Sequence, residues 1–381
     1  MPRVRVAALL LAGSIAWPAA LQTTPAAPTS QTAPAATPKK NPLLKLVEPW
    51  PSPEKMKERR QTAEALPLFS GADVLPVTLA GDFKAINKDH EPESTQLYPG
   101  VVRTDTGTEL QVRFRARGHV RRMARTCDYV PLKVEFVKKA TRGTVFAEQD
   151  ALKLVVQCAG GIDGEQYLLR EYLAYRIFNL ITRQSFRARL AKVSYVDGAT
   201  GKPSGTRLGM FLEDEGDVAR RLEGRIVDVE RLQFDDLDSD ALMPAMIFEY
   251  LIGNTDMSIY ALHNMRIVQR QDKSLHVVPY DFDFSGLVNA PYALPARGLM
   301  LSRVTDRLYR GPCRSQERVD PYVANFVAKK DAIRALPDQI PGFSPLSRDE
   351  ARSYIDGFYH SIDSPKDVRR VFVTCAPKST M

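Results

Sequence analysis

A predicted hairpin with an asparagine directly before it and an aspartate after it constrains this chain more than any other feature. Two apolar runs, residues 265–268 and 275–278, are separated by a polar turn, and this pattern is typical of a β-hairpin. Asn264 and Asp281 lie at the two open ends of the hairpin, so pairing of its strands would bring them together. Asp256 lies on the loop that precedes the hairpin.

These polar side chains are of the types that phosphoryl transfer uses. Asn264 and Asp281 supply hard oxygen atoms suited to Mg²⁺, and Asp283 could share or take over the role of Asp281. Asp256 is the candidate to orient an acceptor hydroxyl and to take its proton. Phosphoryl transfer depends mainly on such positioning and on stabilisation of charge.

The N-terminus has the layout of a secretory signal peptide. Arg3 and Arg5 precede an apolar run over residues 6–15, and small residues follow it, with cleavage expected after Ala16 or Ala20. The run is too short for a stable membrane span, although an uncleaved anchor is an alternative. We therefore predict a signal peptide over residues 1–20 and an exported protein, either periplasmic or extracellular.

Composition divides the rest of the chain. Residues 21–65 are read as a disordered linker rich in Pro, Ala, Thr and Gln, followed by a basic lead-in that packs loosely or forms a short helix. The folded part begins near Leu66. An acidic break at residues 213–217 is the predicted hinge between an N-terminal nucleotide-binding lobe, residues 66–215, and a C-terminal catalytic lobe, residues 216–381.

The formal net charge is +8, and its densest cluster is Arg113, Arg115, Arg117, Arg121, Arg122 and Arg125. A basic patch can bind nucleic acid, but that function also uses interleaved aromatic residues, which are sparse here. An exported protein also rarely meets nucleic acid. We expect no nucleic-acid partner, and interpret the cluster as a phosphate-facing or solvated surface.

The sequence also predicts a disulfide in the first lobe. Residues 109–115, 131–136 and 152–156 have the pattern of strands. If the second and third of these pair antiparallel, Cys127, before one, lies beside Cys158, after the other. In an oxidising compartment these two cysteines are expected to pair, which leaves Cys313 to pair with Cys375.

A long helix is predicted at residues 165–181, with apolar stripes on two sides. Glu171 lies within one stripe, where a carboxylate is costly to bury without a partner. Lys153, on the strand before the helix, is the expected partner. In the alternative interpretation Glu171 points out of a helix end and Lys153 off the sheet. Lys133 is a rival for the phosphate-contacting lysine.

Beyond this helix we expect strands at residues 191–196 and 207–212, and then a mainly helical region. The predicted helices there include residues 246–251 and lie near residues 321–335 and 348–360. The fold class predicted from these elements is α+β.

The order of these parts resembles the atypical kinases of the spore-coat protein H family over roughly residues 109–290. The stretches that carry the resemblance are residues 169–175 (LREYLAY), 251–256 (LIGNTD), 263–264 (HN) and 279–283 (PYDFD). The resemblance implies a bilobal protein kinase-like fold, with an antiparallel N-terminal sheet, one helix and a mainly helical C-terminal lobe.

The same resemblance implies roles for individual residues. Asp256 would be catalytic, Asn264 and Asp281 would hold Mg²⁺, and Lys153, paired to Glu171, would contact the phosphates of a nucleotide, with ATP expected. The turn that contains Arg117 and Gly118 would cover those phosphates, although it has one glycine and several arginines, unlike an ordinary glycine-rich loop.

Four functions are compatible with this pattern. The first is an exported Mg²⁺-dependent kinase that phosphorylates a protein or small-molecule hydroxyl. The others are an inactive binding or scaffold protein, a nucleotidyl transferase, and a metal-dependent hydrolase that uses Asp256, Asp281 and Asp283. Few histidines are available for a hydrolase, because only His119 and His263 are expected near the proposed site.

Overall fold

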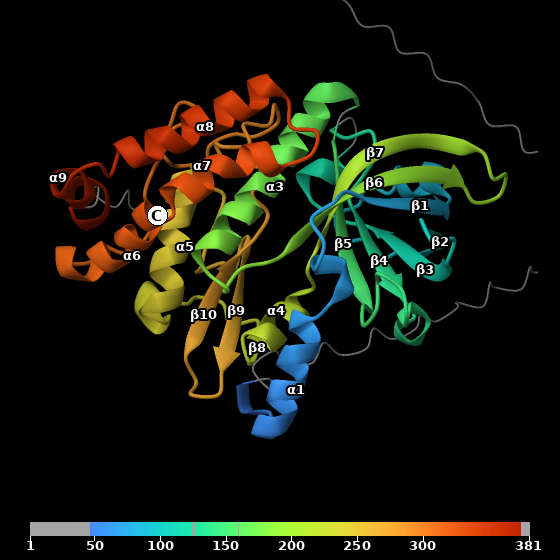
Figure 1. The fold of residues 1–381 in the computed structure, drawn as a ribbon, viewed down its shortest axis with the longest axis horizontal. Helices are drawn as coiled ribbons and strands as arrows, with labels where there is room; N and C mark the ends of the chain where they lie inside the picture. Colours follow the sequence, from blue (N-terminus) through green and yellow to red (C-terminus); the bar gives the residue numbers. More distant parts are fainter. Residues whose placement is uncertain (1–45, 124–125, 159, 375–381) are drawn as a thin grey trace, which may run out of the picture. The chain divides into compact units, whose positions relative to one another are not determined.

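Seven strands close into a barrel in the first part of the chain (Figure 1). The computed structural model describes residues 46–123, 126–158 and 160–374, so the predicted signal peptide and most of the linker lie outside the described residues. The strand order around the barrel is β1-β2-β3-β4-β5-β7-β6. The strands are β1 (Leu75–Gly81), β2 (Tyr98–Thr104), β3 (Glu109–Ala116), β4 (Leu132–Phe136), β5 (Ala151–Val156), β6 (Ala188–Asp197) and β7 (Pro203–Leu212).

Alternation along the strands fills the barrel with apolar side chains. On β3, Leu110, Val112 and Phe114 are buried, while the residues between them face outward. Gly100 on β2 leaves room for the Phe114 ring, because a Cβ atom there would lie 2.2 Å from that ring. The period-two pattern that predicted the strand at residues 109–115 therefore also determines which side chains form the core.

The predicted fold class is wrong in its N-terminal part. Instead of an open antiparallel sheet of a bilobal kinase-like fold, the strands form a closed mixed barrel, in which β1 pairs parallel to β6 with Leu75 opposite Ala191. The sequence analysis missed β1 and β2, both of which contain proline and glycine. β6, the strand that pairs with β1 to close the barrel, is distant from it in sequence, and local periodicity gives no information about such pairing.

The barrel is followed by helices and a small three-stranded sheet. The sheet has the order β10-β9-β8, from β8 (Gly224–Val227), β9 (Met265–Arg270) and β10 (Leu275–Pro279). Because β9 and β10 pair antiparallel, the predicted hairpin is confirmed. The predicted break at residues 213–217 is largely helical, since α4 (Glu215–Arg221) begins within it. The acidic residues there cap and begin a helix, which is a common use of carboxylates at a helix N-terminus.

The long helix α3 (Gly161–Ile181) lies between the barrel and the later helices (Figure 1). It contacts β6 and β7 on one side and α5 and α7 on the other, which is why it is apolar on two faces. The other helices are α1 (Pro53–Glu64), α2 (Phe83–Ile86), α5 (Ser239–Ile252), α6 (Gln316–Ala328), α7 (Lys330–Gln339), α8 (Pro345–His360) and α9 (Pro365–Val368). Within the described ranges, no helix combines the length and apolar character needed to cross a membrane.

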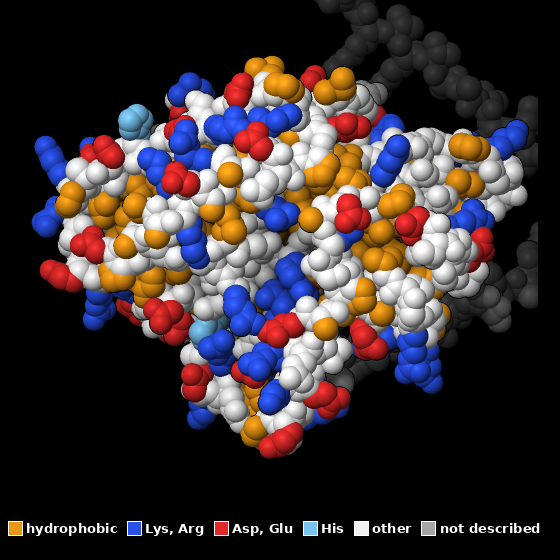
Figure 2. Space-filling model, in the orientation of Figure 1, with side chains coloured by type: hydrophobic (Ala, Val, Ile, Leu, Met, Phe, Trp, Pro, Cys, Tyr) orange, Lys and Arg blue, Asp and Glu red, His pale blue; other side chains and the backbone are white. Residues whose placement is uncertain are grey.

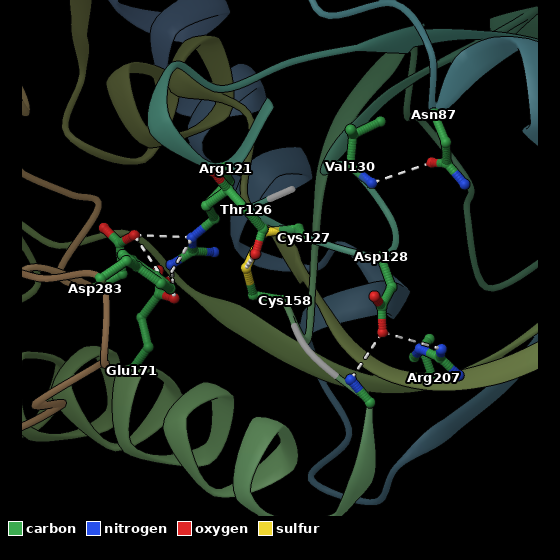
Figure 3. The surroundings of a disulfide bond; sticks show 12 residues. Asn87, Arg121, Thr126, Cys127, Asp128, Val130, Cys158, Glu171, Arg207 and Asp283 are labelled. Carbon is green, nitrogen blue, oxygen red and sulfur yellow. Dashed lines mark hydrogen bonds and ion pairs between the residues drawn. A yellow bond between two sulfur atoms is a disulfide. The ribbon is translucent and has the colours of Figure 1, made fainter. Parts of the chain in front are cut away.

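The predicted disulfide between Cys127 and Cys158 is confirmed (Figure 3). The two Cα atoms are 4.4 Å apart, and the Asp128 N–H donates a hydrogen bond of 2.9 Å to the Cys158 carbonyl. The bond joins the segment after β3 to the end of β5, as the antiparallel pairing of β4 with β5 requires. Cys375 lies outside the described residues, so the second predicted pairing stays a prediction.

Candidate functional site

The end of α5 positions the first candidate residue, Asp256. The helix ends at Gly253 in the left-handed conformation, with φ of +64°, which glycine adopts without steric cost. The Asn254 side chain then accepts a hydrogen bond of 3.0 Å from the Asp256 N–H. Asn264 Nδ2 donates to the Asp256 carbonyl at 2.7 Å and to its Oδ2 at 3.1 Å. The structure therefore brings Asp256 and Asn264 together.

His263 contacts the other oxygen of the same carboxylate. Its Nε2 lies 3.1 Å from Asp256 Oδ1. The hydrogen bond to Asp256 raises the pKa of His263, against the opposing effect of its partial burial. Asp256 is thus held from both sides while its side chain remains 31% exposed, which leaves it accessible to a substrate.

The hairpin brings Asp281 to the same region. Tyr280 donates its N–H to the Asn264 carbonyl at 3.0 Å, and Asp281 donates its N–H to the Tyr175 hydroxyl at 2.9 Å. Asn264 and Asp281 both have left-handed backbones, with φ of +55° and +66°. Such conformations are unfavourable for residues with a Cβ atom and concentrate at functional sites.

Positive charges surround Asp281. Burial alone would raise the pKa of its carboxyl, but the charges of Arg121, Arg117 and Lys153 outweigh that effect and hold the pKa below its usual value. Asp281 is therefore an anion at neutral pH. Arg117 and Lys153, which were predicted to contact phosphates, share the surroundings of a predicted metal ligand.

Lys153 lies over an aromatic ring beside a carboxylate. Its Nζ is 4.6 Å from the centre of the Tyr280 ring and 3.7 Å from Glu215 Oε2. Arg266 contacts the same two groups, with its Nε 2.6 Å from Glu215 Oε2. Burial, reinforced by the charge of Arg117, lowers the pKa of Lys153 to about 8.

The predicted ion pair between Lys153 and Glu171 is wrong, because Glu171 pairs with Arg121 instead (Figure 3). Arg121 Nη2 lies 2.5 Å from Glu171 Oε2, and its Nε lies 2.8 Å from Asp283 Oδ2. The Glu171 side chain is 1% exposed, so the prediction that it is buried and paired is confirmed while the partner differs. Arg121 reaches Glu171 from the turn after β3, whose path could not be inferred from sequence.

This network also changes the interpretation of Asp283. Its Oδ2 accepts hydrogen bonds from Arg121 and, at 3.1 Å, from the Tyr292 hydroxyl. It is buried in an ion pair and is therefore a poorer candidate for the metal than Asp281. In the turn itself, Gly118 has φ of +94°, while Arg121 points inward to Glu171 and Asp283.

The sequence analysis missed Glu249, which lies under the Asp256 loop. It is fully buried in α5 beside the Asn254 amide, and among the described residues neither of its carboxyl oxygens has a partner that meets strict hydrogen-bond geometry. Arg310 Nη1 donates to the Thr255 and Met257 carbonyls on the same loop, at 2.6 and 2.7 Å. Burial raises the pKa of Glu249 to about 8. A signal was present in the sequence, since Glu249 is the lone charged residue of the apolar run 241–252.

Two oxygen-bearing side chains at this site are of the type that magnesium binds. Among the residues that the structure describes, no group of three or more His, Cys, Asp or Glu side chains could hold a metal. Magnesium, however, commonly binds through one or two protein oxygens together with waters and substrate phosphates. Asn264 Oδ1 and the Asp281 carboxylate are such oxygens, and Asn264 uses its Nδ2 for Asp256, which leaves Oδ1 for a cation.

Comparison with known proteins does not assign the chain to a family. No protein-family model matches the chain, and no curated protein matches its sequence. The resemblance to the spore-coat protein H family therefore rests on the short motifs alone.

Replacement of Arg121 should be strongly destabilising. Arg121→Met leaves two buried carboxylates without their cation, so we expect the free energy of unfolding at pH 7 to fall by about 3–5 kcal/mol. Arg113→Met, which removes the ion pair of a largely exposed arginine with Glu135, is the control and should cost about 1 kcal/mol or less. Urea unfolding measures both. Equal losses in the two variants would show that the Arg121 network does not stabilise the fold.

Glu249 should make stability depend on pH. Its carboxyl has a pKa of about 8 in the folded protein against an ordinary value of 4.5, so the neutral form stabilises the fold fully below pH 4.5. That contribution is lost as the pH rises through 8. Glu249→Gln cannot ionise and should therefore gain stability relative to the wild type between pH 5 and pH 9.

Denaturant unfolding across this pH range measures the difference between the two proteins. Glu317→Gln is the matched control, because the pKa of Glu317 is lowered by hydrogen bonds and this exposed group stays ionised over the range. Its difference from the wild type should be constant. A constant difference for Glu249→Gln as well would contradict the assignment of a neutral buried carboxyl.

Proposed function

We propose that the protein is a Mg²⁺-dependent phosphotransferase that moves a phosphate from a nucleotide, with ATP expected, to a hydroxyl group of a protein or a small molecule. The observation that carries this proposal is the hydrogen-bonded pair of Asp256 and Asn264 beside the Asp281 anion, with Lys153 and Arg117 acting on that anion. This arrangement supports the proposal, because phosphoryl transfer needs a proton acceptor, oxygen ligands for a metal and cations for phosphates, and Asp256, Asn264 with Asp281, and Lys153 with Arg117 are candidates for these three roles.

Asn264 and Asp281 would hold the metal ion. When bound, Mg²⁺ neutralises charge on the phosphates of the donor. The protein fixes its two ligands before binding, since the Asn264 carbonyl accepts from Tyr280 and the Asp281 N–H donates to Tyr175. The left-handed backbones at both positions are consistent with residues held for function rather than for stability.

Asp256 would act on the acceptor. In the reaction a bond forms between the acceptor oxygen and the transferred phosphorus, the bond from that phosphorus to the leaving nucleotide oxygen breaks, and the acceptor proton passes to Asp256. His263 and Asn264 each contact one carboxylate oxygen and so fix the orientation of Asp256. Orientation of this kind is a large part of catalysis by a general base.

Lys153 would contact the phosphates of the donor. Its pKa of about 8 keeps it mainly protonated at pH 7. In this structure its charge faces Glu215 and Tyr280 rather than Glu171. We also propose that the enzyme acts outside the cytoplasm, on the basis of residues 1–20, and the Cys127–Cys158 disulfide is compatible with such a compartment.

Substitutions of Asp256 and of Asp281 should impair different properties, turnover in the first case and Mg²⁺-ATP binding in the second. Asp281→Asn removes a charged oxygen ligand, so Mg²⁺-ATP should bind about tenfold more weakly or worse. Asp256→Asn should leave this binding nearly unchanged and lower turnover by roughly 10²–10⁴-fold, because it removes the proton acceptor. Calorimetric titration and detection of the phosphorylated product, with ADP rather than AMP released, measure these effects.

The control for both variants is Asp105→Asn, in the exposed turn between β2 and β3. It should match the wild type in binding and turnover. The proposed function is wrong if the wild type binds no nucleotide, or if neither site variant changes binding or turnover.

A further inference from the structure

Three basic residues lie directly side by side across the outside of the barrel. Arg115 on β3 is opposite Lys133 on β4, and Lys133 is opposite Lys153 on β5. Their strand neighbours, among them Phe114, Leu132 and Leu154, are buried inside the barrel, so the three basic side chains share its outer face. We call Arg115, Lys133 and Lys153 the cationic row.

The cationic row is unfavourable for the fold itself. Like charges directly opposite one another on neighbouring strands destabilise a sheet. Two residues along the same strands, the barrel places opposite charges instead, since Arg113 lies opposite Glu135 with 3.1 Å between Nη2 and Oε2. In the described part of the chain, neither Arg115 nor Lys133 makes an ion pair, and Lys153 shares Glu215 with Arg266.

The surroundings add further positive charge. Arg117 and Arg266 both act on Lys153. Burial alone would raise the pKa of Glu215, but Lys153, Arg266 and Lys133 together outweigh it and lower that pKa. Figure 2 shows Lys and Arg side chains gathered near the middle of the face drawn, between the barrel and the small sheet. One carboxylate thus serves several cations, and an added anion would relieve their repulsion.

We propose that the cationic row binds a chain of linked phosphates, with Arg115 and Lys133 contacting it together with Lys153. The row spans three strands, or roughly 10 Å at about 4.8 Å per strand, so its shape suits an extended anion better than a single phosphate. The side chains are half-buried rather than freely solvated. Binding by charge-assisted hydrogen bonds to several phosphates would compensate the like-charge repulsion.

This inference rests on the proposed function only for what the protein does with the bound phosphate chain. Binding of that phosphate chain is measured without catalysis. Two kinds of ligand contain such a chain of linked phosphates, a nucleoside triphosphate and inorganic tripolyphosphate. Calorimetric titration of the wild type with ATP, tripolyphosphate and orthophosphate, without Mg²⁺, separates them. Equal binding of the first two shows that the phosphate chain alone is recognised, whereas tighter binding of ATP identifies the nucleotide as the ligand.

The variants Arg115→Met and Lys133→Met test the row. Each should bind both phosphate chains about tenfold more weakly or worse, since each removes a charge-assisted contact. Arg113→Met is the matched control on the same strand and face, outside the row, and should bind like the wild type. The inference is overturned if orthophosphate binds as tightly as tripolyphosphate, or if the row variants bind like the control.

Thermal unfolding supplies a second readout that a folding defect would not imitate. Without ligand, Lys133→Met should unfold at a higher temperature than the wild type, because a like-charge contact is removed. With tripolyphosphate the wild type should be stabilised and the variant should respond little. A lower unfolding temperature for Lys133→Met without ligand would contradict the repulsion on which the inference is built.

If tripolyphosphate binds as expected and the wild type transfers no phosphate, the cationic row stands and the proposed function fails. If the wild type transfers phosphate, but Arg115→Met and Lys133→Met bind ATP and tripolyphosphate as the wild type does, the proposed function stands. The inference that the cationic row binds the phosphate chain is then wrong.

Discussion

The buried guanidinium of Arg121 joins the parts of this protein on which the site depends. It connects the turn after β3 to Glu171 on α3, 50 residues away, and to Asp283 beyond β10, 162 residues away. Asp283 lies two residues after Asp281, so the network fixes Asp281 relative to the barrel strand that carries Lys153. The Cys127–Cys158 disulfide ties the same turn to the end of that strand. A buried ion pair adds little net stability, but it makes the loss of either partner costly and so specifies one arrangement.

The site around Arg121 contains several features that are unfavourable for folding. Asn264 and Asp281 have left-handed backbones, and like charges lie side by side on the barrel. Glu249 is a buried carboxyl for which the described part of the chain supplies no hydrogen bond of good geometry. The apolar interior of the barrel and the double-sided packing of α3 compensate for these features. Strained backbones and groups with shifted pKa values cluster at functional sites. The left-handed backbones, the buried Glu249 carboxyl and the neighbouring like charges therefore favour a ligand site in this region.

Local patterns in the sequence were enough to predict much of this region. Two apolar runs around a polar turn identified the hairpin, and local patterns predicted the barrel strands β3 to β7. The antiparallel pairing expected for β4 and β5 led to the disulfide. Because a hairpin brings its own ends together, Asn264 and Asp281 could be placed on one side from sequence alone. The same local reasoning predicted α3 and the burial of Glu171.

Contacts between distant segments could not be predicted in this way. The parallel pairing of β1 with β6 closes the barrel, and the sequence of neither strand indicates which strand it pairs with. Arg121 was visible as one of several clustered arginines, but the path of its turn decides that it, and not Lys153, reaches Glu171. The cationic row likewise exists only through the register of three strands.

The most direct test of the account is thermal unfolding of the purified protein with Mg²⁺, with ATP, and with both. A ligand that binds only the native state must stabilise it, by about 2.7 kcal/mol at a concentration of a hundred times its dissociation constant. The account predicts a rise in unfolding temperature with ATP that increases further when Mg²⁺ is added, while Mg²⁺ alone has little effect. An unfolding temperature that does not change under any of these conditions would contradict it.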